Sequence, residues 1–292
     1  MRQVLTVLST ILAVAISATS FAASCGDVNN SGNINILDAT YLITYLYKSG
    51  PAPNCGAGYV GICGDVNNSG SVNLLDVTYL ISYLYKSGPA PVCGCGTVTD
   101  INGNVYKTIV IGSQCWMAEN LKVTNYRNGD AIPNVTSDYI WFELTTGAYC
   151  NYNNNVGNVA LYGRLYNWHA AVDARNIAPT GWHVPSDAEW QILVNYLGGD
   201  AVAGGKMKEA GTTHWLTPNT GATNESGFTG LPAGRRDLDG YFLNLGGIGY
   251  FWSTTVAPAN HAWFRNLHYY LESVTHGDYA QVGGFSIRCV KD

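Results

Sequence analysis

The chain is poor in charged residues. Of its 292 residues, 15 are Lys or Arg and 20 are Asp or Glu, which gives a formal net charge of −5 at pH 7. A nucleic-acid-binding protein concentrates basic residues on one surface, and no such excess is present here. We therefore expect no nucleic-acid partner.

The familiar catalytic motifs are missing as well. The sequence has no GxSxG nucleophile elbow, no HExxH zinc motif and no phosphate-binding P-loop. Its carboxylates are too scattered to nominate the pair that a glycosidase needs. His183 lies near Asp187 and Glu189, but helix capping explains this group more simply than catalysis does. His169 beside Trp168 is explained by packing, so the sequence predicts a non-catalytic protein.

Long apolar runs are absent except near the N-terminus, where residues 4–16 follow Arg2. With a cleavage site at Ser20-Phe21-Ala22 or at nearby small residues, this run predicts a secretion signal over residues 1–23, and hence a secreted, extracellular or cell-surface protein. The run is too short to span a membrane, and no later segment is long enough. Lipidation of Cys25 after Ala-Ala-Ser is the alternative. The internal counterpart of this cysteine, Cys63, instead favours a role for Cys25 in the repeat described next.

The chain contains an internal repeat. Residues 25–53 read CGDVNNSGNINILDATYLITYLYKSGPAP, and residues 63–91 read CGDVNNSGSVNLLDVTYLISYLYKSGPAP. The copies differ at five positions and lie 38 residues apart. A fixed period of this kind indicates duplication. We refer to residues 24–95 as the repeat module.

Each copy opens with the spacing of a calcium loop. Ca²⁺ binds about six to eight oxygens, and a 12-residue loop supplies them from positions 1, 3, 5, 7, 9 and 12, with glycine at position 6. The predicted ligands are Asp27, Asn29, Ser31, Asn33, Asn35 and Asp38 in the first copy, and Asp65, Asn67, Ser69, Ser71, Asn73 and Asp76 in the second. With two carboxylates in each loop, we expect two weakly bound calcium ions, with a Kd of about 10⁻⁴ M. A turn without metal is the alternative.

The residues after each loop predict an amphipathic helix. An apolar stripe of helical period runs through Leu37, Tyr41, Leu42, Tyr45 and Leu46, and the second copy repeats it with Leu75, Tyr79, Leu80, Tyr83 and Leu84. Gly-Pro at 50–51 and at 88–89 should stop the two helices.

The doubled string GDVNNSG with LD, the apolar helix and the GPAP ending resembles a type I dockerin over about residues 25–95. The resemblance implies that loop positions 10 and 11 and the following helix face bind a cohesin-like protein. The implied partner-binding residues are Ile36, Leu37, Thr44, Tyr45, Leu74, Leu75, Ser82 and Tyr83. These positions are more apolar than is usual in the family, so a neighbouring subunit is an alternative partner. A calcium-held spacer, with Leu37 and Leu75 in its core, is the structural alternative.

Export would make disulfides possible for the eight cysteines, which are Cys25, Cys55, Cys63, Cys93, Cys95, Cys115, Cys150 and Cys289. The duplication leaves two arrangements for the repeats. Either each copy closes on itself, or Cys25 pairs with Cys93 and Cys55 with Cys63. The other four cysteines would then pair among themselves. The spacing of Cys93 and Cys95, without nearby histidines, argues against zinc.

A Cys/Gly linker at residues 92–99 precedes a larger C-terminal domain, residues 97–292. Asn102-Gly103 predicts a tight hairpin turn. Ser186 and Glu189 have the capping-box spacing and predict a helix over 186–197. We also expect a shorter helix over 165–174, long loops over 125–160 and short strands elsewhere.

Strings throughout this domain resemble the paralogous domain first described in Fibrobacter succinogenes. They include TDINGNVYKTIVIG, YGRLYNWHAA, APTGWHVPSDAEWQILVNYLGG and GFSIRCVKD, in order through residues 99–292. GWHVPSDAEW and GFSIRCV are also similar to motifs of formylglycine-generating enzymes, and this resemblance implies a C-type-lectin-like fold. The sequence has no cysteine arrangement that would carry the catalysis of those enzymes. The expected fold class is therefore α+β, with a small all-α calcium-loop module followed by a lectin-like domain with long loops.

Aromatic and amide side chains gather between residues 253 and 283. Such a mixture suits ligand recognition, because aromatics give rigid contact area and amides give hydrogen bonds. The predicted ligand-binding residues are Asn260, His261, Trp263, Asn266, His268, Tyr269, Tyr270, His276 and Tyr279. Core positions for Trp263, Phe264 and Tyr270 are the alternative. Since side chains alternate along a strand, we expect about half of the stretch to be exposed.

Together these patterns predict a secreted, non-catalytic surface or adhesion protein. Its dockerin-like module would carry a lectin-like domain that recognises a glycan or a surface protein. Two alternatives stay open, namely a component of a cellulosome-like, polysaccharide-degrading assembly and a structural subunit of a surface filament or coat.

Overall fold

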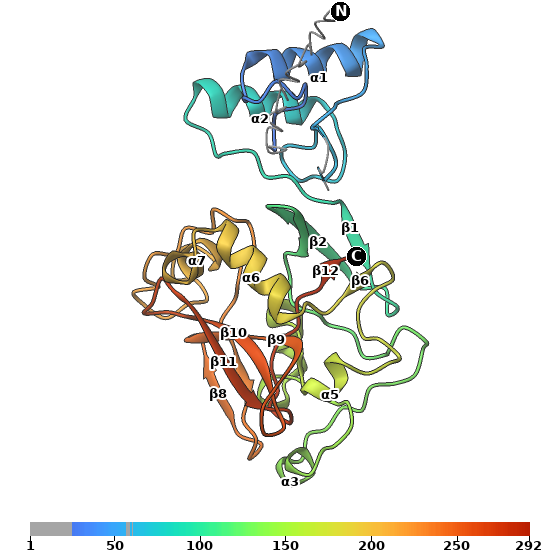
Figure 1. The fold of residues 1–292 in the computed structure, drawn as a ribbon, viewed down its shortest axis with the longest axis vertical. Helices are drawn as coiled ribbons and strands as arrows, with labels where there is room; N and C mark the ends of the chain where they lie inside the picture. Colours follow the sequence, from blue (N-terminus) through green and yellow to red (C-terminus); the bar gives the residue numbers. More distant parts are fainter. Residues whose placement is uncertain (1–24, 57–58, 60) are drawn as a thin grey trace, which may run out of the picture.

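The computed structural model describes residues 25–56, 59 and 61–292, so the predicted secretion signal lies outside the described residues. Two helices lie at one end of the long axis, and a larger body of sheets and short helices makes up the rest (Figure 1). The predicted α+β class is confirmed. Within the described ranges, no helix has the length and apolar character needed to cross a bilayer.

The repeat module is built from α1 (Ile36–Lys48) and α2 (Leu74–Tyr85). Each helix starts at an asparagine, Asn35 or Asn73, whose side chain accepts a hydrogen bond from the backbone two residues later. Gly50 N donates to the Thr44 carbonyl just past the end of α1, and any side chain at Gly50 would overlap Thr44. The predicted helix stops are therefore confirmed.

The predicted apolar stripe is only partly right. Leu42 is buried, but Leu37 and Tyr45 are exposed, and the inward face also includes Ala39. The reason is the buried carboxylate of Asp38, which accepts backbone hydrogen bonds inside the loop and so fixes how the helix is rotated. The second copy repeats this pattern, with Val77 and Leu80 buried and Leu75 and Tyr83 exposed.

The disulfides select one of the two predicted arrangements. The start of each repeat is bonded to the end of the other, through Cys25–Cys93 and Cys55–Cys63. A third bond, Cys95–Cys115, ties the linker to the C-terminal domain. The expectation that Cys150 and Cys289 also pair is wrong. They are buried thiols in two separate apolar clusters of that domain.

The C-terminal domain contains two five-stranded sheets and one strand pair. The first sheet has the order β1-β2-β3-β12-β6, with β1 (Thr97–Thr99), β2 (Val105–Ile111), β3 (Gln114–Met117), β6 (Trp182–His183) and β12 (Val290–Lys291). The second has the order β11-β10-β9-β7-β8, with β7 (Ala233–Arg236), β8 (Phe242–Leu245), β9 (Ile248–Ala257), β10 (His261–His268) and β11 (Val274–Ala280). β4 (Tyr149–Cys150) pairs with β5 (Leu165–Tyr166). The helices of the domain are α3 (Asp138–Phe142), α4 (Val159–Tyr162), α5 (Trp168–Ala171), α6 (Asp187–Tyr196) and α7 (Asp200–Met207).

The second sheet is covered on both faces. Side chains of α6 and α7 pack with Phe251 and Leu267 on one face, while Trp168 and Phe285 cover the other. Buried indoles also donate hydrogen bonds to backbone carbonyls, as Trp252 does to Tyr166 at 2.9 Å. These contacts bury large aromatic rings without leaving their N–H groups unpaired.

Several predicted elements of this domain are confirmed and one is wrong. The hairpin at Asn102-Gly103 joins β1 to β2, and α6 begins with the predicted capping box of Ser186 and Glu189. The shorter helix over 165–174 is replaced by β5 and the four-residue α5. Tyr166 pairs in both directions with the backbone of Phe285, which holds this segment extended until the helix starts at Trp168.

Buried cations hold the long loops of the domain. Lys208 is fully buried and donates to the carbonyls of Thr220, His268 and Leu271 at 2.8–2.9 Å. Burial lowers its pKa to about 8. Arg236 and Arg288 are fully buried too, and their guanidinium groups donate to carbonyls of Val135, Thr136, Gly240, Met117, Phe228 and Thr229. Loop carbonyls that would otherwise be buried without partners are thereby satisfied.

The repeat module contacts the C-terminal domain through the loop of its second copy. Asn68 donates from its side chain to the Thr108 carbonyl of β2 at 2.7 Å. The backbone of Val110 donates to the Cys93 carbonyl at 2.8 Å. The equivalent residue of the first copy, Asn30, lies instead against Gly56 of the inter-repeat linker.

Thiol chemistry tests the disulfide arrangement. Cys150 and Cys289 should resist alkylation in the native protein, because both are buried and burial raises the pKa of Cys150 to about 12. Peptide mapping should give two labelled cysteines after denaturation and none before it. Native labelling, or a Cys150–Cys289 bond, would contradict the structure.

Candidate functional site

In the two loops of the repeat module, the predicted ligand side chains form hydrogen bonds with the backbone of their own loop. Asp27 accepts hydrogen bonds from the Ser31 and Gly32 backbones at 2.9 and 2.7 Å. Ser31 Oγ and Asn35 Nδ2 both lie 3.2 Å from the Asn33 carbonyl oxygen. The second copy has the same contacts among Asp65, Asn67, Ser69, Ser71 and Asn73, to within 0.1 Å.

The carboxylate at the end of each loop folds back onto its start. Asp38 accepts from the Val28 backbone at 2.9 Å and from Asn35 at 2.8 Å, and Asp76 does the same with Val66 and Asn73. Burial raises the pKa of Asp38 and Asp76, although these backbone hydrogen bonds lower it. The nearby charges of Asp27 and Asp65 raise it further.

Each loop therefore holds two buried carboxylates. Asp27, Asp38, Asp65 and Asp76 are all nearly inaccessible, and among the described residues no Lys, Arg or His forms an ion pair with them. Buried negative charge normally has a compensating cation. Oxygen is the only ligand atom type that these loops offer, which fits a hard divalent cation. In the described part of the chain, no group of three or more His, Cys, Asp or Glu side chains could hold a metal ion. In the two loops, the oxygens other than those of the two aspartates come from amides, hydroxyls and backbone carbonyls.

The predicted partner-binding residues lie on the outer faces of α1 and α2. Leu37 is 59% exposed and Leu75 63%, so the alternative that places them in the core is wrong. Ile36, Tyr45, Leu74 and Tyr83 are exposed and Thr44 and Ser82 half-buried. A shallow groove of about 280 Å³ lies on this face of α1, and Leu37, Thr40 and Thr44 line it with Asn29, Tyr41 and Pro51.

The predicted ligand-binding stretch is divided over separate surfaces. Asn260, Tyr270 and His276 are exposed, Asn266 is buried, and His261, Trp263, His268, Tyr269 and Tyr279 are half-buried. Phe264 lies in the core between the sheet and Phe285. Because a strand rises about 3.3 Å per residue, the two ends of β10 lie about 23 Å apart. One small ligand therefore cannot contact the whole set.

One group lies where β10 and β11 pass the start of α6. Trp263 and Arg265 of β10 face the same side as Asp278 and His276 of β11. The His276 and Trp263 rings are 4.4 Å apart. Asp187 Oδ1 lies 2.8 Å from Arg265 Nη1 and 3.1 Å from His276 Nε2. The sequence did not reveal the role of Asp187 or Arg265, since their contact joins positions far apart in the chain.

The other residues of the stretch lie elsewhere. His268, Tyr269 and Tyr270 form an aromatic cluster at the opposite end of β10, with ring centres about 5 Å apart. Tyr279 lies on the opposite face from Trp263, where its hydroxyl donates to Asp237. Asn266 shares that face and is covered by neighbouring side chains.

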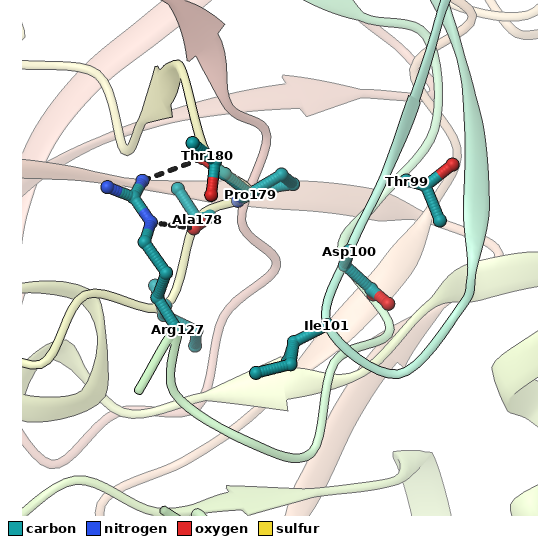
Figure 2. Close-up of a pocket in the computed structure, with 8 residues that line it drawn as sticks. Thr99, Asp100, Ile101, Arg127, Ala178, Pro179 and Thr180 are labelled. Atoms are coloured by element: carbon teal, nitrogen blue, oxygen red, sulfur yellow. Dashed lines mark hydrogen bonds between the residues drawn. The ribbon is translucent and has the colours of Figure 1, made fainter. Parts of the chain in front are cut away.

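A pocket that the sequence did not predict lies between the first hairpin and residues 177–180 (Figure 2). Its volume is about 260 Å³. Arg127 donates from one side of it to the carbonyls of Ala178 and Pro179, at 3.0 and 2.6 Å. Asp100 accepts from the Asn104 side chain and from the Tyr106 hydroxyl at 2.8 and 2.6 Å. These charged groups are occupied in holding the pocket walls, so their role is structural.

His183 has a structural role of the same kind. Its Nε2 lies 2.7 Å from Glu189 at the start of α6, and its Nδ1 lies 2.7 Å from Asp292. Burial lowers the pKa of His183, but the hydrogen bonds to Asp292 and Glu189 outweigh this and raise it. The histidine thus joins β6, α6 and the segment after β12.

The C-terminal domain is of the mixed α+β class. It has curled sheets, few helices and long loops whose carbonyls accept hydrogen bonds from buried Lys and Arg side chains. Residues 109–291 match the model of the family described as the Fibrobacter succinogenes major domain. The match spans more than half of the chain, which therefore belongs to this family. No curated protein and no solved structure matches the chain.

The pH dependence of stability tests the His183 contacts. A raised pKa means that His183 stabilises the fold fully below its unfolded pKa of about 6.5 and loses this contribution as pH rises through the folded value. His183→Gln should therefore cost most stability near pH 6 and little near pH 9. Urea unfolding across this range measures the difference, and parallel curves for the two proteins would refute it.

Proposed function

We propose that the chain is a secreted, non-catalytic surface or adhesion protein. A calcium-stabilised, dockerin-like repeat module would attach the chain to a partner, and a C-type-lectin-like domain would recognise a glycan or a surface protein. The observation that carries this proposal is the pair of loops with buried carboxylates and oxygen-only ligands, followed in each copy by an exposed apolar helix face.

Calcium would neutralise the buried charge of each loop. Asp27, Asn29, Ser31, Asn33, Asn35 and Asp38, with their counterparts in the second copy, would hold one ion per loop. Three disulfide bonds accompany this arrangement and are typical of proteins outside the reducing cytosol. The bonds at Cys25 and Cys63 also favour a structural role for these cysteines over lipidation of Cys25.

Ligand recognition would use the group around Trp263. It combines a half-buried indole, an imidazole 4.4 Å from it and the carboxylates of Asp187 and Asp278, which is the chemistry that sugar hydroxyls and their apolar ring faces need. The cluster at Tyr269 and Tyr270 is the second candidate surface of the domain.

A structural subunit of a filament or coat is the second candidate function. Eight large apolar side chains are exposed on the two short helices of the repeat module, more than a spacer between domains needs.

Removal of one charge per loop tests calcium binding. Asp27→Asn with Asp65→Asn keeps the side-chain size and an oxygen acceptor. At a calcium concentration of about a hundred times Kd, each intact loop would contribute about 2.7 kcal/mol. The variant should therefore melt at lower temperature than the wild type in calcium and at the same or higher temperature in chelator, where it removes buried charge. Asp239→Asn, at an exposed site, is the control. An equal loss in both conditions would show that the loops bind no metal.

A glycan array tests the recognition surface. The wild-type chain should bind a defined set of glycans, and Trp263→Ala should weaken binding by roughly tenfold or more, because aromatic residues dominate such contacts. Tyr270→Ala should have a smaller effect. Silence of the wild-type chain on the array would leave the lectin role without support, and hydrolysis of a polysaccharide would contradict the non-catalytic assignment.

A further inference from the structure

The C-terminal domain exposes a second apolar surface, far from the repeat module. α3 and the turn before β8 contribute Tyr139, Ile140, Phe142, Leu238 and Tyr241, and we name this surface the α3 tip. Tyr139 is 77% exposed and Tyr241 64%. The buried Arg236 holds the two segments together, because it donates to Asp138 at 2.7 Å and to the Gly240 carbonyl at 2.9 Å. Isolated apolar residues on a surface are common, but a contiguous group of this kind marks an interaction site.

The charge around the α3 tip has one sign. Asp138, Glu143 and Asp239 are exposed beside the apolar side chains. Residues 128–163 and 237–264 contain no Lys or Arg. Arg236 is fully buried and pairs with Asp138, and Arg235 pairs with Asp237, so Glu143 and Asp239 carry the unpaired negative charge of the rim. A partner of the α3 tip should therefore present an apolar centre with a basic rim.

The exposed charge of the repeat module has the opposite sign. Residues 25–95 contain six charged residues, of which the four aspartates are buried in the loops. The other two, Lys48 and Lys86, are exposed at the ends of α1 and α2, next to the exposed Tyr47 and Tyr85. The outer faces of the helices thus combine apolar side chains with basic charge only.

These two surfaces lie at opposite ends of the molecule. Figure 1 shows α1 and α2 at one end of the long axis and α3 at the other. Two α3 tips would repel each other, and so would two helix faces, whereas a tip and a helix face attract. We propose that the α3 tip of one chain docks on the helix face of the repeat module of a second copy of this chain. The contact is heterologous, so it builds head-to-tail chains or rings rather than closed dimers.

This inference rests on the proposed docking role of the repeat module and names its partner. Sedimentation velocity of residues 24–292 in calcium should show association that increases with protein concentration. High salt should weaken the association, because the rim charges are exposed and therefore screened. Tyr139→Ser with Phe142→Ser should weaken it by roughly tenfold or more, since both side chains lie at the centre of the contact. Val256→Ser, also at an exposed apolar position but outside both surfaces, should have no effect.

Exchange of charges gives the decisive test. Glu143→Lys with Asp239→Lys makes the tip basic, and Lys48→Glu with Lys86→Glu makes the helix faces acidic. Each variant alone should be monomeric, because its two ends carry the same sign. A mixture of the two should associate again, since each basic surface then meets an acidic one. Recovery on mixing also shows that both variants are folded.

Three results would overturn the inference. The first is a wild-type chain that stays monomeric at every concentration in calcium. The second is association that the tip and charge variants leave unchanged. The third is a chain that cosediments with insoluble polysaccharide and loses this binding on Tyr139→Ser, which would assign the α3 tip to a glycan. Melting curves recorded with and without calcium distinguish a failure of the head-to-tail contact from a failure of the proposed calcium module. Calcium stabilisation of a monomeric chain leaves the proposed calcium module standing, whereas its absence removes both.

Discussion

The C-terminal domain depends on buried cations that bind backbone carbonyls. Much of this domain is loop, and loops cannot satisfy their own peptide groups as helices and sheets do. Arg236, Arg288 and Lys208 supply these hydrogen bonds from fully buried positions, without a fully buried carboxylate beside them. Because each cation bridges segments that are distant in the sequence, its loss would release several loops at once. Although the chain has few charged residues, the loops of this domain depend strongly on three of them.

The repeat module has the complementary arrangement. Its loops bury aspartates, and the donors inside the chain are backbone N–H groups rather than cations. These hydrogen bonds orient the carboxylates, and among the described residues no Lys, Arg or His side chain pairs with them. The exposed charged residues of the module are Lys48 and Lys86, whereas the α3 tip exposes acidic residues, so the two ends of the molecule differ in charge.

The sequence predicted the elements that local patterns determine. The duplication, the hairpin at Asn102-Gly103, the capping box of Ser186 and the stops at Gly50 and Gly88 all rest on neighbouring residues. The rotation of α1 escaped prediction because it depends on Asp38 reaching back across the loop. The grouping of Asp187 with His276 escaped it because pairing between β10 and β11, and packing under α6, decide which side chains meet. Alternation along β10 correctly indicated two faces, but periodicity cannot show that its two ends are too far apart for one small ligand.

The crossed disulfides of the repeats have a mechanical consequence. Cys25 and Cys93 stand at the two ends of the module, so their bond provides a covalent path that bypasses both helices and both loops. Tension applied between the start of the module and the C-terminal domain would run through this bond and leave the loops unstretched. A protease cut in the linker at 56–62 would likewise leave the halves joined through Cys55–Cys63. A module built in this way can tolerate pulling and nicking that would unravel an uncrosslinked helical pair.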